Sequence, residues 1–248
     1  MKLAFFGGTF DPVHLGHLAI ARAAADKLAL DLVYFVPADV PPHKRGRNLT
    51  EFQHRFAMLA LATAEDQRFV PSLLEANSGH PNYSIQTVRL LKSTLKKSDK
   101  LYFLIGIDAF MEIGSWRQPV ELLSECDFVV ANRPGYSLGD IAKALPGPLR
   151  PSDTVLQALR RQHSGNTIVL PSTTIHLLDS VHESISSTQI RAAAHKSVKQ
   201  LSSHVPRMVA EYIRKEHLYL GSSPKREKES AGEASKVLSF RRARHQEQ

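Results

Sequence analysis

The segment from Gly7 to His17 holds the densest group of residues that could do chemistry, Gly-Gly-Thr-Phe-Asp-Pro-Val-His-Leu-Gly-His. Gly7 and Gly8 carry no side chain, so the backbone can approach a ligand closely there. His14 and His17 lie one turn apart at the expected start of a helix, so both rings can face one site. Backbone N–H groups at a helix start favour an anion. The segment therefore predicts an anion-binding site that contains two histidines.

Three other kinds of site do not fit this segment. His14 and His17 would give a metal ion two ligands, and no third ligand is placed by its spacing, so a zinc site is not expected. A Walker A loop is excluded because no Gly-Lys-Ser/Thr follows. A dinucleotide fingerprint is excluded because the Gly-x-Gly-x-x-Gly spacing is missing.

Two further segments carry residues suited to a phosphate. Lys44 is a point charge on a loop stiffened by prolines. Ser187 and Thr188 are expected at a helix start, where hydroxyls and backbone N–H groups can bind a phosphate, and Arg191 follows one turn later. The plainer interpretations are a solvated surface lysine and an ordinary helix cap with an exposed arginine, and the residues alone leave both open.

Three more candidates follow predicted strands. Trp116, the single tryptophan, can stack on the ring of a ligand or simply fill the core. Asp108 can accept a ribose hydroxyl or cap the next helix, and Arg133 can hold a phosphate or line a loop. The residue types allow a nucleotide-binding site without requiring one.

The elements that position these residues alternate between continuous apolar runs and helical patterns. Continuous apolar strands separated by helices are typical of a parallel sheet covered on both faces. The sequence therefore predicts an α/β fold, a doubly wound Rossmann-like parallel sheet with helices on both faces. Strands are expected at 3–6, 32–36, 69–74, 101–105, 128–131, 167–170 and 175–178, and helices at 17–30, 50–65, 84–97, 119–125, 152–162, 187–195 and 205–216.

In such a fold, ligands bind beyond the carboxyl ends of the strands, here from Gly7, Pro37 and Gly106 onward. A capping box is predicted at Thr50, and Ser84 is expected to cap its helix. Residues 133–153 are rich in proline and glycine and are expected to form a long loop with room for one helical turn. Residues 1–220 are expected to form one domain, and 221–248 a charged, disordered tail.

The composition excludes several classes of protein. The 248 residues are 42% hydrophobic and 23% charged, which excludes a largely disordered chain. A single cysteine, Cys126, excludes a disulfide scaffold and suits a reducing compartment. No apolar run is long enough for a membrane helix, and the N-terminal run is too short for a signal peptide. The expectation is a cytoplasmic protein that does not act at a membrane.

The basic charge leaves a second class of function open. The net charge is +8, and residues 221–248 carry seven basic and four acidic residues, so +3 of it lies in the tail. Such a balance allows a nucleic acid, an anionic lipid or small phosphorylated ligands, and does not choose among them. A nucleic-acid-binding protein acting through this tail is the non-enzyme alternative. Interleaved glutamates, and Phe240 as the single aromatic residue of the tail, weaken it.

The first segment resembles the Gly-Thr/Ser-Phe-Asp-Pro-x-His-x-Gly-His signature of the adenylyltransferase and cytidylyltransferase superfamily. Five other segments are similar to segments of the bacterial nicotinate-nucleotide adenylyltransferase family. Residues 83–87 depart from the family, which more often has Tyr-Thr-Ile-Asp-Thr there. The resemblance spans residues 3–220 with gaps. Its segments are Pro-Pro-His-Lys at 41–44, Tyr-Ser-Ile-Gln-Thr at 83–87, Gly-x-Asp at 106–108 with Trp116, Arg-Pro-Gly at 133–135, and Ser-Ser-Thr-Gln-Ile-Arg at 186–191.

The resemblance implies a nucleotidyltransferase that moves the adenylyl group of ATP onto nicotinate mononucleotide in NAD biosynthesis, giving nicotinate adenine dinucleotide and pyrophosphate. It implies ATP and nicotinate mononucleotide as partners, with Mg²⁺ bound to ATP, no protein-held metal and no nucleic acid. A homo-oligomer stays open. Nicotinamide mononucleotide or phosphopantetheine as the acceptor is the alternative within this class.

The same resemblance implies three sets of site residues. The catalytic set is His14, His17 and Arg191. The ATP-binding set is Gly7, Gly8, Thr9, Phe10, His14, His17, Gly106, Asp108, Ser187, Thr188 and Arg191. The acceptor-binding set is Lys44, Tyr83, Ser84, Trp116 and Arg133.

Overall fold

The computed structural model describes residues 1–41, 49–133, 135–161, 167–178, 186–195 and 197–220. The chain divides into two compact units, Met1–Leu218 and Tyr219–Gln248. Only Tyr219 and Leu220 of the second unit are described, so the predicted tail at 221–248 lies outside the described residues.

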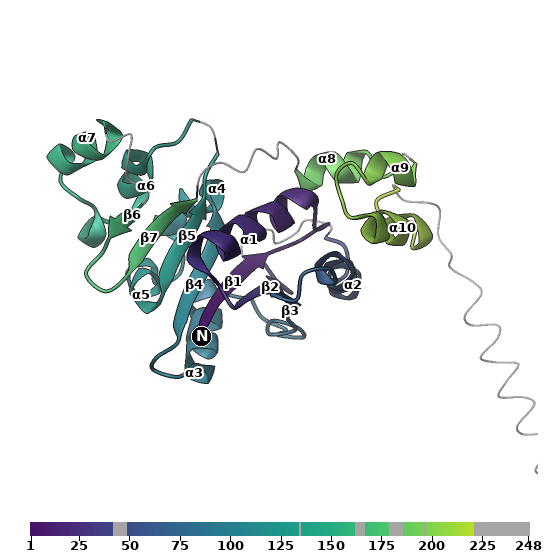
Figure 1. The fold of residues 1–248 in the computed structure, drawn as a ribbon, viewed down its shortest axis with the longest axis horizontal. Helices are drawn as coiled ribbons and strands as arrows, with labels where there is room; N and C mark the ends of the chain where they lie inside the picture. Colours follow the sequence, from purple (N-terminus) through teal and green to yellow (C-terminus); the bar gives the residue numbers. More distant parts are fainter. Residues whose placement is uncertain (42–48, 134, 162–166, 179–185, 196, 221–248) are drawn as a thin grey trace, which may run out of the picture. The chain divides into compact units, whose positions relative to one another are not determined.

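A seven-stranded sheet forms the centre of the first unit (Figure 1). The strand order is β3-β2-β1-β4-β5-β7-β6, and every neighbouring pair is parallel except β6 and β7. The predicted doubly wound α/β fold is confirmed, with one antiparallel strand at an edge. The strands are β1 (Lys2–Gly8), β2 (Leu32–Pro37), β3 (Phe69–Pro71), β4 (Lys100–Gly106), β5 (Asp127–Ala131), β6 (Thr167–Val169) and β7 (Thr174–Leu178).

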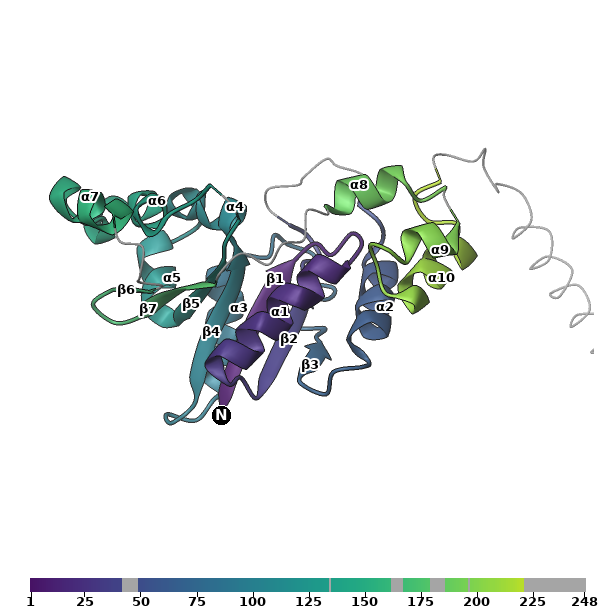
Figure 2. The ribbon, with the colours of Figure 1, turned by 45° about the horizontal axis from the view of Figure 1, so that its top comes forward.

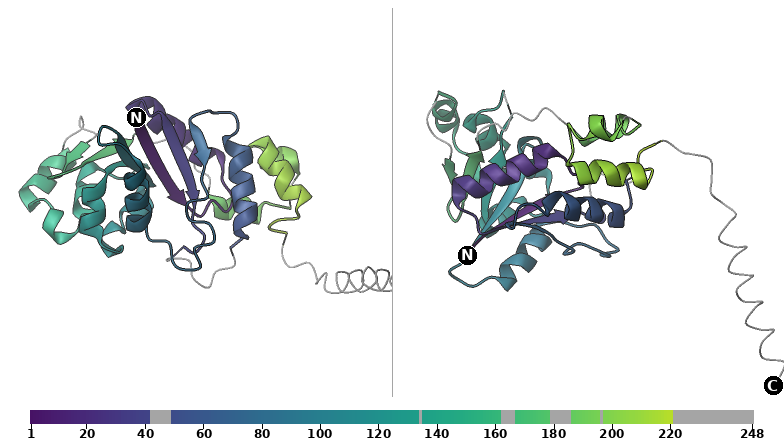
Figure 3. Two further views of the ribbon diagram at one scale, coloured as in Figure 1. Left: turned by 90° about the horizontal axis from the view of Figure 1, so that it is seen from below. Right: turned by 45° about the vertical axis from the view of Figure 1, so that its right-hand side comes forward.

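Helices cover both faces of this sheet. Helix α1 lies on one face, and α3 and α5 lie on the other (Figures 1 and 3). Helices α9 and α10 lie beside α2 (Figure 2), where the Nδ1 atom of His54 is 2.8 Å from the hydroxyl of Tyr212. The helices are α1 (Leu15–Leu28), α2 (Phe52–Thr63), α3 (Ser84–Thr94), α4 (Ile107–Phe110), α5 (Pro119–Glu125), α6 (Leu138–Ala144), α7 (Asp153–Arg161), α8 (Ser187–Ala192), α9 (Val198–Leu201) and α10 (Arg207–Lys215), with short 3₁₀ turns η2 (Ile113–Ser115) and η3 (Gly147–Leu149).

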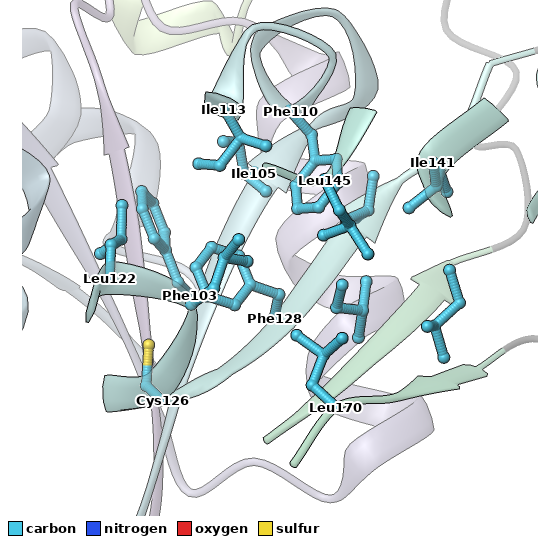
Figure 4. Packing of buried hydrophobic residues seen from close by; sticks show 14 of the residues in the cluster. Phe103, Ile105, Phe110, Ile113, Leu122, Cys126, Phe128, Ile141, Leu145 and Leu170 are labelled. Atoms are coloured by element: carbon cyan, nitrogen blue, oxygen red, sulfur yellow. The ribbon is translucent and has the colours of Figure 1, made fainter. Parts of the chain in front are cut away.

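The main core lies between the sheet and the helices on one of its faces, α3 and α5. Phe103 of β4 and Phe128 of β5 lie in its centre with ring centroids 5.4 Å apart (Figure 4). The side chain of Cys126 is buried in the same cluster. This burial of continuous apolar strands is the feature that predicted the fold.

Three predictions about local structure are wrong. The predicted long loop at 133–153 contains α6 and η3. The predicted capping box at Thr50 does not form, because α2 begins one residue later with Glu51 as its N-cap. The cap of α3 is Tyr83, and Ser84 is the first helical residue.

No helix among the described residues is long and apolar enough to cross a membrane.

Candidate active site

A cavity of about 390 Å³ lies at the carboxyl ends of β1 and β4. We call it the histidine cavity, because both predicted histidines line it. Parallel strands end at this edge of the sheet, and α1 and α8 begin beside it. Its lining residues are Phe6, Gly7, Thr9, Asp11, His14, His17, Ile20, Leu49, Gly106, Arg133, Ser186, Ser187, Thr188 and Arg191.

The two histidines form a stacked pair at the start of α1. Their ring centroids are 3.7 Å apart with an interplanar angle of 28°. The backbone N–H of His14 donates to Nδ1 of His17 at 3.2 Å. Since Nδ1 of His17 accepts this hydrogen bond, the neutral ring carries its proton on Nε2. Nε2 of His17 is therefore a donor.

His14 is held in its neutral form. Only 8% of the residue is exposed, and burial lowers the pKa of its imidazole to about 4, with the charge of Arg133 acting in the same direction. Its Nδ1 atom is buried and has no hydrogen-bond partner among the described residues. The ring is therefore a neutral group with one unused polar atom.

The first turn of α1 has fewer backbone N–H groups available to an anion than the sequence predicts. The backbone N–H of Leu15 donates to the carbonyl of His204 at 2.9 Å, and the N–H of His17 donates to the carbonyl of His14. Because these donors are already used inside the protein, side chains must supply most of the contacts to an anion here.

Helix α8 is fastened to the loop after β1, although the two are far apart in sequence. The hydroxyl of Ser187 donates to the carbonyl of Pro12 at 3.0 Å. Nη1 of Arg191 donates to the carbonyl of Asp11 at 2.7 Å, and Nη2 donates to the hydroxyl of Thr188 at 3.2 Å. These bonds place α8 against the histidine cavity.

A second, smaller cavity of about 120 Å³ lies between the start of α3 and the segment after η2. We call it the tryptophan pocket. The guanidinium of Arg117 lies 4.8 Å from the ring centroid of Tyr83. The pocket therefore combines aromatic rings with a cation. Its lining residues are Asn82, Tyr83, Ser84, Ile85, Ser115, Trp116, Arg117 and Leu122.

Comparison with known proteins places this arrangement in a family. The cytidylyltransferase-like family model matches residues 5–193. Relatives from Geobacter sulfurreducens and Desulfotalea psychrophila, both named "probable nicotinate-nucleotide adenylyltransferase", are each 37% identical, and the alignments cover 88% of this chain and 98% and 99% of the relatives. The chain belongs to the nicotinate-nucleotide adenylyltransferase family. The predicted family and enzyme class are thereby confirmed.

Solved structures agree on the fold of this adenylyltransferase. Nicotinic acid mononucleotide adenylyltransferase from Plasmodium falciparum, in complex with NaAD, matches with a TM-score of 0.65 and 17% identity, over 89% of this chain and 98% of that one. The same enzyme in complex with APC matches with a TM-score of 0.63.

Most of the predicted site residues of the adenylyltransferase lie in two groups. Eight line the histidine cavity together: Gly7, Thr9, His14, His17, Gly106, Ser187, Thr188 and Arg191. Three of the predicted acceptor residues line the tryptophan pocket: Tyr83, Ser84 and Trp116. Lys44 lies outside the described residues.

Four other predicted residues lie outside these two groups. Arg133 lines the histidine cavity rather than the tryptophan pocket. Asp108 does not line either cavity, and its carboxylate lies 2.6 Å from Nη1 of Arg133. The ring of Phe10 is buried behind His17 at a centroid distance of 5.1 Å. Gly8 packs closely on that ring. A Cβ at this position would lie only 3.1 Å from Cζ of Phe10.

Sequence reasoning missed Arg55 of α2. It is 2% exposed, and Nη1 donates to the carbonyls of Thr9 at 2.9 Å and Ala38 at 2.8 Å. Nε donates to the carbonyl of Thr50 at 2.8 Å. One buried guanidinium thus joins the loops after β1 and β2. The signal in the sequence is an arginine directly before the apolar run from Phe56 to Ala62 in α2.

Proposed function

We propose that the protein transfers the adenylyl group of ATP to nicotinate mononucleotide, giving nicotinate adenine dinucleotide and pyrophosphate. The observation that carries the proposal is the joint lining of one cavity by His14, His17 and Arg191, in a chain of this family. The names of the relatives, and NaAD in the Plasmodium structure, support the choice of acceptor.

In the proposed reaction, a 5′-phosphate oxygen of the mononucleotide attacks the α-phosphorus of ATP. The new P–O bond forms as the bond to pyrophosphate breaks. The attacking phosphate is already an anion, so no side-chain base is needed. The chain would contribute alignment and charge stabilisation by preorganised donors, namely Nε2 of His17, His14 and the guanidinium of Arg191.

The tryptophan pocket would hold the pyridine ring of the acceptor. Stacking on Trp116 suits any pyridine ring. Arg117 and the positive end of α3 favour the carboxylate of nicotinate over an amide. Lys44 would hold the phosphate of the mononucleotide, as the resemblance implies, and Arg133 would join the ATP site.

Magnesium would enter with ATP. The described residues contain no group of three metal-ligating side chains, and Asp11 is the acidic residue that lines the described part of the histidine cavity. This donor set fits Mg²⁺, which keeps water and phosphate ligands and needs only one or two carboxylates. Bound magnesium would neutralise phosphate charge. We further propose a cytoplasmic location, which the single cysteine supports.

The test is pyrophosphate release from ATP with nicotinate mononucleotide, nicotinamide mononucleotide or phosphopantetheine. We expect turnover with the first and much lower kcat/KM with the others. His17→Ala should lower kcat about 100-fold, because it removes a preorganised donor, with little change in mononucleotide affinity. His195→Ala, at an exposed position, is the matched control. Equal use of the two mononucleotides, or an active His17→Ala variant, contradicts the proposal.

A further inference from the structure

Glu75 is a buried carboxyl that the proposed reaction does not use. It lies between β3 and α3, and 8% of the residue is exposed. Its Oε1 accepts a hydrogen bond from the hydroxyl of Thr87 in α3 at 2.5 Å. Thr87 is also buried, with 5% exposed. A buried carboxyl is costly in its charged form, so its presence here calls for a physical role.

The segment that carries Glu75 is also fastened to the end of β2. The backbone N–H of Ser78 donates to Oδ2 of Asp39 at 3.2 Å. Val40 and Asn82 exchange two hydrogen bonds, at 2.8 and 3.1 Å. The segment therefore lies between the loop after β2 and the first turn of α3, and the bond between Glu75 and Thr87 closes it against the helix.

The tryptophan pocket depends on this arrangement. Four of its lining residues, Asn82 to Ile85, connect the segment to α3. The backbone N–H of Thr87 donates to the carbonyl of Tyr83, so a shift of Thr87 would be transmitted to the pocket wall. The pocket wall is thus held from one side by Asp39 and Val40 and from the other by Glu75.

The surroundings of Glu75 disfavour the ionised form of its carboxyl. Burial raises the pKa of its carboxyl to about 7, and the neighbouring charge of Asp39 also raises it, while the hydrogen bond from Thr87 acts in the opposite direction. Arg117 is the cation among the described residues that line the pocket. Ionisation of Glu75 would therefore add a second negative charge on the Asp39 side.

We propose that Glu75 is a positioning residue for the acceptor, whose carboxyl holds the start of α3 through Thr87 and whose negative charge, when it ionises, weakens binding of the anionic mononucleotide. The proposal rests on the proposed function, because it takes nicotinate mononucleotide as the ligand of the tryptophan pocket. It makes mononucleotide affinity, and not ATP affinity, sensitive to this buried group.

Trp116 supplies the measurement, because it is the single tryptophan and lines the pocket. Its fluorescence gives the Kd of nicotinate mononucleotide for the full chain at about pH 6.5 and pH 8.5. Glu75→Gln removes the titration and keeps a polar side chain, and Glu65→Gln changes an exposed carboxyl as the control. The ligand phosphate has a pKa near 6, so the ratio of wild-type Kd to Glu75→Gln Kd is compared at the two pH values.

We expect this ratio to rise about threefold to tenfold with pH, as one added charge near an anion predicts, while Glu65→Gln follows the wild type. Thr87→Val should weaken mononucleotide binding severalfold at both pH values without changing KM for ATP, and Thr87→Ser should restore it. A flat ratio, or equal losses for ATP and mononucleotide in Thr87→Val, overturns the proposal.

Turnover of the wild type separates this proposal from the proposed function. If pyrophosphate is released with nicotinate mononucleotide and the ratio is flat, only the role of Glu75 is overturned. If the wild type neither binds nor turns over nicotinate mononucleotide, the proposed function is overturned, and the role of Glu75 with it.

Discussion

The charge of His14 is set by its surroundings rather than by its type. Burial and the nearby Arg133 lower the pKa of its imidazole to about 4, so the ring is neutral at neutral pH. A phosphate of ATP in the histidine cavity would act in the opposite direction, because a nearby anion favours the charged imidazole. The ring is thus poised to gain positive character when negative charge arrives.

The low pKa of His14 predicts a loss of stability in acid. An unfolded histidine takes up a proton near pH 6.5, whereas His14 in the folded protein takes it up only near pH 4. The unfolded state therefore binds more protons in this window, and stability falls as pH drops through it. Between about pH 7 and pH 4.5, the free energy of unfolding should therefore fall by roughly 2 kcal/mol more in the wild type than in His14→Asn.

Urea unfolding of both proteins at the two pH values measures this difference. His195→Asn, at an exposed position, should lose as much stability in acid as the wild type. An equal acid loss in the wild type and in His14→Asn would show that the ring is not held neutral.

At the scale of elements, local signals predicted what local interactions determine. Pro119 starts α5, which ends at Glu125 as the sequence indicates. The prediction of a long loop at 133–153 is wrong because it relied on the glycine and proline content. It overlooked a helix signal, the capping box of Ser137 and Asp140. Tertiary packing decides there, since Leu138 and Ile141 of α6 are buried in the main core. Composition cannot report that contact.

The candidate site divides in the same way. The spacing of His14 and His17 predicted that their rings share a site, and both line one cavity. The helix start at Ser187 predicted a phosphate contact, and only the resemblance placed that helix start in the same site as the histidines. The tryptophan pocket was predicted only through the resemblance to a family. Arg55 could not be found, because its partners are backbone carbonyls of distant loops, which leave no trace in residue type.

Arg55 should be essential to the element that it holds. Arg55→Met leaves three carbonyls without their donor, each worth about 1–3 kcal/mol when buried, so the melting temperature should fall by several degrees. Arg55→Lys keeps the charge but cannot reproduce the fork of donors. Because the two loops that Arg55 joins belong to both proposed substrate sites, this variant should raise KM for ATP and KM for the mononucleotide.

Thermal unfolding and steady-state kinetics of the two Arg55 variants test this. Arg22→Met, which changes a half-exposed side chain paired with Asp66, is the matched control and should resemble the wild type. Wild-type stability in Arg55→Met would show that the three hydrogen bonds contribute nothing.

At the scale of the whole molecule, the order of the strands explains where the site lies. Strand β1 has β2 on one side and β4 on the other, so the chain reverses its direction of winding at β1. Doubly wound sheets bind ligands in the crevice at this switch point. Gly7 at the end of β1 and Gly106 at the end of β4 both line the histidine cavity.

The same organisation predicts that the last 28 residues are dispensable for the reaction. Every described residue that lines either cavity lies between Phe6 and Arg191. Residues 221–248 contain only Val237, Leu238 and Phe240 as large apolar residues. We expect so little apolar surface to contribute less than the entropy that ordering a segment costs. A chain that stops after Leu220 should keep its melting temperature within about 2 °C and its kcat and KM within about twofold.

Salt-dependent binding to single- and double-stranded DNA is measured in parallel, because seven basic residues of the tail would account for any weak affinity of the full chain. Loss of turnover on truncation would show that the tail completes the site. Tight DNA binding that disappears with the tail, together with no turnover in the full chain, would favour the nucleic-acid alternative over the adenylyltransferase.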